Sequence, residues 1–300
     1  MTACQHSTEG DSHSLETIDS LQNHIAILDS TLEDFVNGRS EGEGDPVELA
    51  RSEVRYLKSE FVPQTYQLKI SFPKSYFKTP NKKYPVLYVL DAETNFGGVS
   101  YIVQRLIKDG LIPEILVVGI AYDTDYKNFY RLRSRDLTPV ELPNLSIGGN
   151  PVDPTGGAPA FSKFLEEELF PFVEDEYRIQ PNDRALYGHS YGGLFGAYTF
   201  IENPDLFNRY LLLGPSLWFN DNYLLEEVMN QPDTMTTPTN LYMGSGEHEG
   251  RIDDLQVEFV KTVKNRNLSN LKVTSEVAPN ETHRTIFGIG FTNGLRFIYE

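Results

Sequence analysis

The sequence predicts an α/β fold, in which one mostly parallel central sheet carries helices on both faces. Two observations support this prediction. Several short apolar runs, such as Tyr84–Asp91 and Ile115–Ala121, lack the alternation of a half-exposed strand and are typical of strands buried on both faces. Segments with a helical period separate these runs, and strands that alternate with helices build open parallel sheets.

The elements follow in order from local patterns. The strand at 64–72 alternates, with Tyr66, Leu68, Ile70 and Phe72 on one face. Helices are expected where apolar residues recur every three or four positions. The expected strands span residues 53–57, 64–72, 84–91, 115–121, 184–187, 210–213, 241–243 and 271–277, and the expected helices span 101–110, 161–177, 194–203, 255–267 and 292–299.

Residues 1–50 are expected to be a polar N-terminal segment with a short amphipathic helix around Leu21–Phe35 and a linker over Gly38–Asp45. Residues 51–300 then form one domain. As the sequence stands, its start has no apolar signal core, which predicts a cytoplasmic protein. Alternatively, Thr2–Gln5 resembles the end of a bacterial lipoprotein signal. If Cys4 were lipidated after a missing signal, the protein would be periplasmic or membrane-anchored.

Composition excludes several functions. The chain has 26 Lys and Arg against 43 Asp and Glu, a formal net charge of −17, which repels the phosphates of nucleic acids. The single cysteine, Cys4, excludes an intramolecular disulfide and a multi-cysteine zinc site. No run approaches the roughly 18 apolar residues of a transmembrane helix. We expect no metal and no organic cofactor, and the oligomeric state stays open.

A nucleophile motif follows the strand at 184–187. Gly188-His-Ser190-Tyr-Gly192 is Gly-x-Ser-x-Gly between a predicted strand and a predicted helix. Such a tight turn lifts the serine hydroxyl above the sheet at a helix N-terminus. The pattern therefore predicts Ser190 as a nucleophile and residues 51–300 as a catalytic domain. The alternative is a glycine-rich turn with a capping serine.

The base and the acid are expected on later loops, in the order serine, acid, histidine. His283 follows the last predicted strand, where this fold carries its base. The alternative is a surface-loop imidazole. The acid is expected after the strand at 241–243, where four carboxylates stand, and the sequence alone does not choose among them: Glu247, Glu249, Asp253 and Asp254.

These motifs resemble the putative-esterase (esterase D-like) branch of the α/β-hydrolase superfamily. Within it, the chain is most similar to the siderophore esterases of the enterobactin and bacillibactin type. The resemblance covers roughly residues 53–300 and rests on the segments Tyr84–Asp91, Arg133–Pro139, Gly156–Ala158, Phe161–Tyr177, Gly188–Gly193, Pro204–Phe207, Gly214–Trp218, His283 and Gly294–Phe297.

The resemblance implies an α/β-hydrolase fold and favours Glu249 as the acid, with Glu247 and Asp253 as alternatives, because the family carries its acid in a Gly-x-x-Asp/Glu pattern. It also implies an oxyanion hole made of the backbone N–H groups of Tyr191 and Glu93. Two such donors stabilise the charge that develops on the carbonyl oxygen.

Substrate contacts are expected from four residues: Arg133, Arg135, Trp218 and Asp91. We expect the arginines to lie with Arg131 on one loop after a central strand, where they would offset the acidic charge. Alternatively, these arginines face solvent and pair with Asp136 or Glu141, and Trp218 only packs against a loop.

The resulting prediction is a serine carboxylic-ester hydrolase that works through an acyl-enzyme and cleaves a siderophore trilactone. Its partner would be a small-molecule ester. The alternatives are an esterase that acts on acetyl or feruloyl sugars or on thioesters, a transferase that passes the acyl group to an alcohol, and a non-catalytic binding protein with the same fold.

Overall fold

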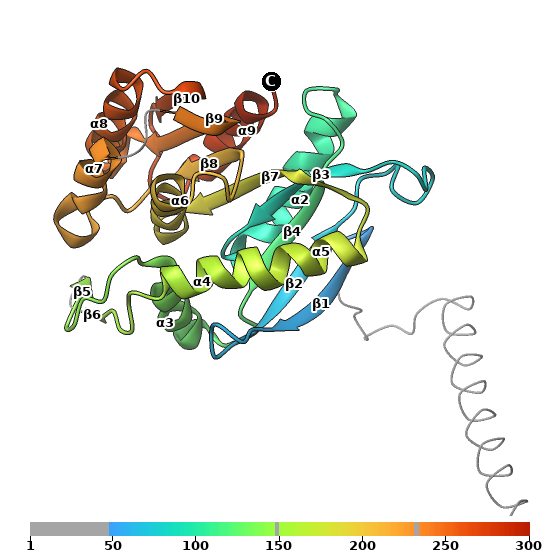
Figure 1. The fold of residues 1–300 in the computed structure, drawn as a ribbon, viewed down its shortest axis with the longest axis horizontal. Helices are drawn as coiled ribbons and strands as arrows, with labels where there is room; N and C mark the ends of the chain where they lie inside the picture. Colours follow the sequence, from blue (N-terminus) through green and yellow to red (C-terminus); the bar gives the residue numbers. More distant parts are fainter. Residues whose placement is uncertain (1–47, 148–149, 231–233) are drawn as a thin grey trace, which may run out of the picture. The chain divides into compact units, whose positions relative to one another are not determined.

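One twisted sheet organises the protein in the computed structural model, which describes residues 48–147, 150–230 and 234–300 (Figure 1). Eight strands of the described residues pair in the order β1-β2-β4-β3-β7-β8-β9-β10. β1 and β2 pair antiparallel, as do β2 and β4, and each later neighbour pair is parallel. Their bounds are β1 Ser52–Lys58, β2 Thr65–Ser71, β3 Tyr84–Val89, β4 Leu116–Ala121, β7 Ile179–His189, β8 Arg209–Leu213, β9 Thr234–Gly246 and β10 Ser269–Ala278.

Helices cover both faces, which confirms the predicted α/β-hydrolase architecture. In β3, Val86 and Tyr88 belong to the core beneath α4, α5, α6 and α8, whereas Leu87 and Val89 belong to the core beneath α2 and α9. A strand buried on both faces has no polar alternation, which explains its continuous apolar sequence. The helices are α2 Ala92–Lys108, α3 Tyr126–Leu137, α4 Ala158–Phe164, α5 Phe170–Glu176, α6 Tyr191–Glu202, α7 Tyr223–Glu227, α8 Arg251–Asn265 and α9 Ile286–Ile298.

Several helices differ from the sequence-based expectation: α7 was not predicted, α9 begins at Ile286 instead of residue 292, and α3 and α2 differ more strongly. The predicted loop around Arg131–Arg135 is instead part of helix α3, whose N-cap Asp125 accepts a hydrogen bond from Asn128 N at 2.9 Å. Its many polar side chains weaken the helical period that the prediction relied on. Helix α2 begins at Ala92, nine residues before the predicted start, because burial of Phe96 and Val99 overrides the low helix propensity of the glycines around them.

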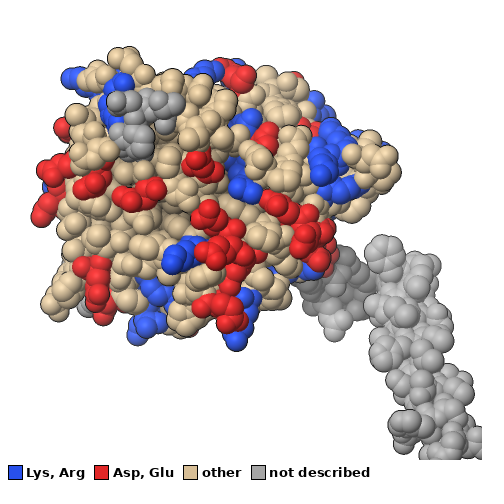
Figure 2. All heavy atoms as spheres, in the orientation of Figure 1, with Lys and Arg blue, Asp and Glu red and all other residues tan. Residues whose placement is uncertain are grey.

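The described chain also contains shorter elements. A five-residue π-helical turn over Leu165–Leu169 joins α4 to α5, and β5 (Ser146–Ile147) pairs with β6 (Asn150–Pro151). Acidic side chains lie across the face that α4 and α5 cover, as the net charge leads one to expect (Figure 2).

The predicted N-terminal helix, the linker and Cys4 lie outside the described residues. Within them, no helix has the length and apolar character to span a membrane. In the same part of the chain, no cluster of three or more His, Cys, Asp or Glu side chains could hold a metal ion.

Candidate active site

Ser190 stands on a strained turn between β7 and α6. Its φ of 59° is a left-handed value that residues with a side chain rarely adopt. The turn is tight enough that a Cβ on Gly188 would lie 2.1 Å from Gly192 O, so the motif needs glycine there. Ser190 N donates to Leu213 O at 2.9 Å, and Ser216 N donates to Ser190 O at 3.1 Å. These two bonds fix the turn to the end of β8.

His283 and Glu249 come together beside this turn. His283 lies on the connection from β10 to α9, and its Nδ1 is 2.5 Å from Glu249 Oε2. The other carboxylate oxygen, Oε1, accepts a hydrogen bond from Gly246 N at 2.5 Å, and the Glu249 side chain is fully buried. Both oxygens of the carboxylate are therefore held, and the imidazole is oriented from its Nδ1 side.

The two alternative carboxylates point elsewhere. Glu247 Oε2 accepts a hydrogen bond from Asn280 N at 3.0 Å. Asp253 lies in the first turn of α8, a position where a carboxylate interacts favourably with the helix dipole. The structure therefore brings only Glu249 of these candidates to His283.

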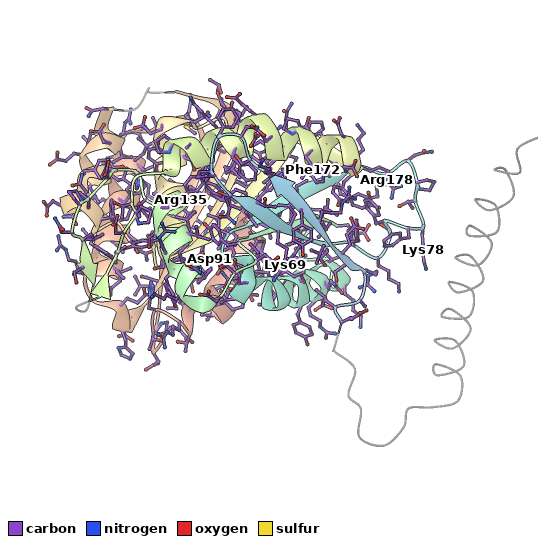
Figure 3. All side chains as sticks on the ribbon, turned by 90° about the horizontal axis from the view of Figure 1, so that it is seen from below. Lys69, Lys78, Asp91, Arg135, Phe172 and Arg178 are labelled. Carbon is purple, nitrogen blue, oxygen red and sulfur yellow. The ribbon has the colours of Figure 1, made fainter. Side chains whose placement is uncertain are left out.

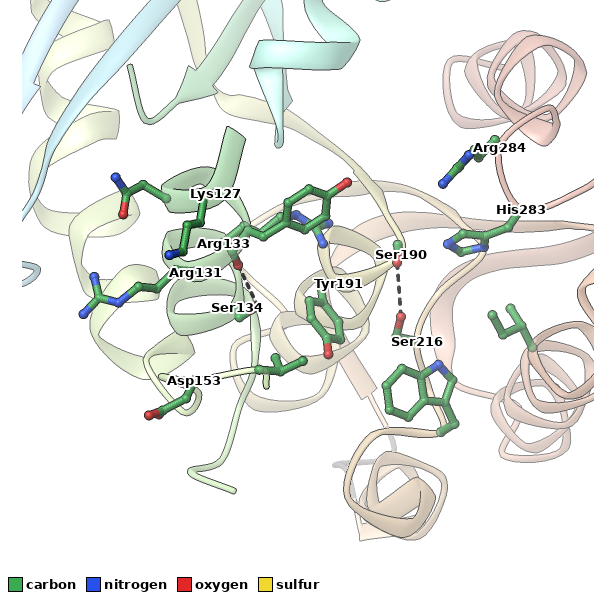
Figure 4. Close-up of a pocket in the computed structure, with 15 residues that line it drawn as sticks. Lys127, Arg131, Arg133, Ser134, Asp153, Ser190, Tyr191, Ser216, His283 and Arg284 are labelled. Carbon is green, nitrogen blue, oxygen red and sulfur yellow. Dashed lines mark hydrogen bonds between the residues drawn. The ribbon is translucent and has the colours of Figure 1, made fainter. Parts of the chain in front are cut away.

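The Ser190 hydroxyl lies 3.4 Å from Ser216 Oγ (Figure 4). Among the described residues, no hydrogen bond joins Ser190 Oγ to His283. Catalytic hydrogen bonds are often long before substrate binds.

Two cavities meet at Ser190 and His283. The larger has a volume of about 1120 Å³ and the smaller about 390 Å³. Besides Ser190 and His283, the larger is lined by Lys127, Asn128, Tyr130, Arg131, Arg133, Ser134, Val152, Asp153, Tyr191, Ser216, Trp218, Ile252 and Arg284. The smaller is lined by Asp91, Thr94, Asn95, Phe129, Tyr130, Arg133, Tyr187, His189, Arg284 and Phe287.

Arg133 is the buried cation of the site. Its Nε and Nη2 donate to the two carboxylate oxygens of Asp91 at 2.8 and 2.7 Å. Burial disfavours its charge, yet the carboxylate of Asp91 holds the pKa of Arg133 above its ordinary value. The guanidinium also lies 5.3 Å from the ring centroid of Tyr191 and 5.7 Å from that of Phe129. Arg133 therefore lines both cavities as a neutralised pair with Asp91.

Arg135, a predicted substrate contact, is not among the described residues that line either cavity. Residues two apart on a helix point to opposite sides, so Arg133 and Arg135 diverge on α3. Arg135 instead donates to the fully buried carboxylate of Asp136 at 2.6 Å. Figure 3 shows Asp91 and Arg135 at one end of the sheet, with Lys78 and Arg178 at the opposite end.

The two expected oxyanion donors are placed differently. Tyr191 is the first residue of α6, so its N–H has no acceptor within the helix, and the residue lines the larger cavity. Glu93, in the first turn of α2, lines neither cavity within the described residues. Its carboxylate accepts a hydrogen bond from Tyr122 N, and burial raises the pKa of that carboxyl.

Other lining residues were missed from sequence. Lys127, Tyr130 and Ser134 reach the larger cavity from α3, where spacings of three and four residues place them on one side. That spacing is visible in the sequence once the segment is treated as a helix. Arg284 adjoins His283 and is exposed. Trp218, predicted from sequence, lines the larger cavity.

Comparisons with known proteins agree with this geometry. Residues 59–286 match the family model described as "Putative esterase". The ferri-bacillibactin esterase BesA of Bacillus subtilis is 29% identical over 279 residues, which cover 88% of this chain and 94% of that protein. The BES protein from Bacillus cereus superposes with a TM-score of 0.77 at 27% identity, covering 86% of this chain and 99% of the other. An IroE-like serine hydrolase from Shewanella oneidensis superposes with a TM-score of 0.71 at 28% identity, covering 83% and 80%.

The family match spans most of the folded body, from β1's end to the start of α9. It includes the Ser190 turn, the Glu249 loop and His283. The chain is a carboxylic-ester hydrolase, and it belongs to the "Putative esterase" family, in which it is most similar to siderophore esterases.

Proposed function

We propose that the protein hydrolyses esters through an acyl-enzyme on Ser190, with His283 as the base and Glu249 as the residue that orients it. The observation that carries this proposal is the contact of 2.5 Å between His283 and the buried Glu249, beside a serine that opens into two cavities. A buried carboxylate fixes the imidazole tautomer and stabilises the imidazolium that forms.

The reaction then proceeds in two halves. His283 Nε2 takes the Ser190 proton while Ser190 Oγ attacks the ester carbonyl, and the imidazolium returns this proton to the departing alcohol. Water deprotonated by His283 attacks the acyl-enzyme, and the carboxylic acid leaves as Ser190 regains its proton. The N–H of Tyr191, at the start of α6, is the proposed donor to the developing oxyanion.

The proposed substrate is a siderophore ester. Relatives that cover most of the chain include an esterase named for ferri-bacillibactin, and the larger cavity suits a bulky, anionic ligand. Its described lining holds four Lys or Arg side chains against one acidic residue, Asp153, on a chain whose net charge is −17. Since Arg133 is neutralised by Asp91, the other cations, Lys127, Arg131 and Arg284, supply the attraction.

The two cavities fit an ester with a group on each side of the carbonyl. Ser190 and His283 line both, so a carbonyl bound between them would extend into each. The smaller cavity has the aromatic side chains of Phe129 and Phe287 on its walls and the amide of Asn95 among its polar groups. It therefore suits a smaller arm of the substrate that carries an apolar part.

The reaction type is tested with wild type and Ser190→Ala on p-nitrophenyl acetate, followed by labelling with a fluorophosphonate probe. Wild type should hydrolyse the ester and take up one probe per chain, and Ser190→Ala should do neither. Equal rates for the two proteins would refute the serine mechanism.

The substrate is tested by incubating the enzyme with iron-loaded and iron-free bacillibactin and enterobactin and detecting linear products by mass spectrometry. Acetylated and feruloylated sugars run in parallel. Cleavage of the siderophores with little activity on the sugar esters is expected, and the reverse pattern would refute the siderophore assignment.

The cationic lining is tested with Arg131→Gln. The KM for the iron-loaded, anionic siderophore should rise several-fold and depend less on salt, because exposed charges act through a screened field. Hydrolysis of p-nitrophenyl acetate should not change. Lys78→Gln, an exposed cation at the opposite end of the sheet, is the matched control. Equal KM shifts in both variants would contradict the role given to Arg131.

A further inference from the structure

The connection that carries His283 is exposed on its outer side. Thr282, Arg284 and Thr285 around the histidine are exposed, and the His283 side chain itself is 36% exposed. An exposed connection between a strand and a helix is normally one of the more mobile parts of a protein. A catalytic base must instead hold its position relative to the nucleophile to within a fraction of an ångström.

His189 contacts this connection from the nucleophile side. Its Nε2 lies 2.6 Å from the backbone oxygen of His283, and the centroids of the two rings are 4.5 Å apart. Because a carbonyl oxygen only accepts, Nε2 of His189 carries the hydrogen and donates it. His189 therefore links the residue next to the nucleophile directly to the backbone of the base.

His189 stays neutral while it does this. Burial, with a smaller effect from His283, lowers its pKa to about 4, whereas Asp91 and the hydrogen bond to His283 act in the opposite direction. Because His189 is neutral, it does not repel the positive charge that His283 acquires during catalysis. Two adjacent imidazolium ions would repel each other.

Glu247 contacts the connection at a second point, closer to β10. Its Oε2 accepts a hydrogen bond from Asn280 N at 3.0 Å, and the next residue, His248, donates its backbone N–H to Glu281 O at 3.0 Å. Glu249, two residues further along, binds the imidazole itself. One short segment after β9 thus supplies both the acid and the anchors of the strand-to-helix connection.

We propose that His189 and Glu247 are positioning residues that hold the backbone of this connection at two points, His283 itself and Asn280, so that the base keeps its distance to Ser190. This inference rests on the proposed function, because it assigns these residues to the same serine mechanism. In this proposal, His189 of the Gly188-His-Ser190 motif and Glu247 hold the backbone of the connection that carries His283, and Glu247 is not the catalytic acid.

The test compares pairs of variants that differ only in hydrogen bonding. His189→Gln keeps an N–H donor at nearly the position of Nε2, and His189→Met has the same length without a donor. Glu247→Gln keeps an acceptor oxygen, and Glu247→Met removes it. Each is assayed on p-nitrophenyl acetate from pH 5 to pH 9, and thermal unfolding is recorded for each.

We expect kcat to fall about 30- to 100-fold in His189→Met with KM within about twofold, the size of effect that a misplacement of about 1 Å produces. His189→Gln should retain kcat within about fivefold. Glu247→Met should lose about tenfold in kcat and Glu247→Gln less than threefold. Because Glu247 is exposed, its pair tests the inference even if His189→Met fails to fold.

A His189→Met enzyme within threefold of wild type would overturn the inference, as would equal losses in the Gln and Met members of both pairs. Failure of the proposed function looks different, because wild type itself would then neither hydrolyse the ester nor react with a fluorophosphonate.

Discussion

Replacing Glu249 by Gln isolates the electrostatic part of the proposed mechanism. The substitution keeps the size of the side chain and removes its negative charge. Glu249 Oε2 is 2.5 Å from His283 Nδ1, and the carboxylate is fully buried, whereas the imidazole is 36% exposed and partly screened by solvent. With the charge centres about 4 Å apart and an effective dielectric constant of about 20, the interaction with imidazolium is worth about 4 kcal/mol.

An energy of about 4 kcal/mol corresponds to roughly a 10³-fold change in rate. The glutamine amide can also present an N–H to Nδ1 and favour the wrong tautomer, which costs about 10⁴-fold where it has been measured in a serine protease. We therefore expect kcat/KM for p-nitrophenyl acetate to fall by about 10³ to 10⁴, measured by the release of p-nitrophenolate.

Asp253→Asn is the matched control, because it removes a carboxylate from the same segment without touching His283. It should remain within about threefold of wild type. If Glu249→Gln kept a tenth or more of the wild-type activity, the assignment of the acid would be refuted. The same holds if Asp253→Asn lost more activity than Glu249→Gln.

Three further perturbations follow from the same contacts. A Cβ on Gly214, at φ +47°, would lie 2.8 Å from His283 Nδ1, so Gly214→Ala should lower kcat at least about 100-fold, and an unchanged kcat would contradict the geometry. Arg133→Met leaves Asp91 buried and unpaired, which should cost about 3–5 kcal/mol and lower the Tm by more than about 6 °C; a smaller shift in calorimetry would refute this. The His189 pKa of about 4 in the folded state lies below its ordinary value of 6.5, so the unfolded chain takes up this proton first. The free energy of unfolding should therefore fall by up to about 3 kcal/mol as the pH drops from about 6.5 to 4, and urea titrations should show a flatter dependence in His189→Gln.

Local patterns were sufficient for most of the fold. Turn glycines, apolar runs and helical periods predicted each strand of the main sheet and the helices that alternate with them. They missed the five-residue helix α7, and they failed at helix α3, because Tyr126–Leu137 is rich in polar and charged side chains and its period is weak. The consequence reached the site, since Arg133 and Arg135 were expected together and the helix turns them apart.

Residues that are neighbours in the chain were enough to predict the architecture, the serine turn and the loop of the histidine. Which side chains pair when they are far apart in the chain depends on how the elements pack. Glu249 and His283 are 34 residues apart, and Arg133 and Asp91 are 42 apart. Four carboxylates of one segment look equivalent in sequence. Only packing of that segment against the connection from β10 to α9 directs Glu249 to the imidazole, Glu247 to a backbone N–H and Asp253 to a helix end.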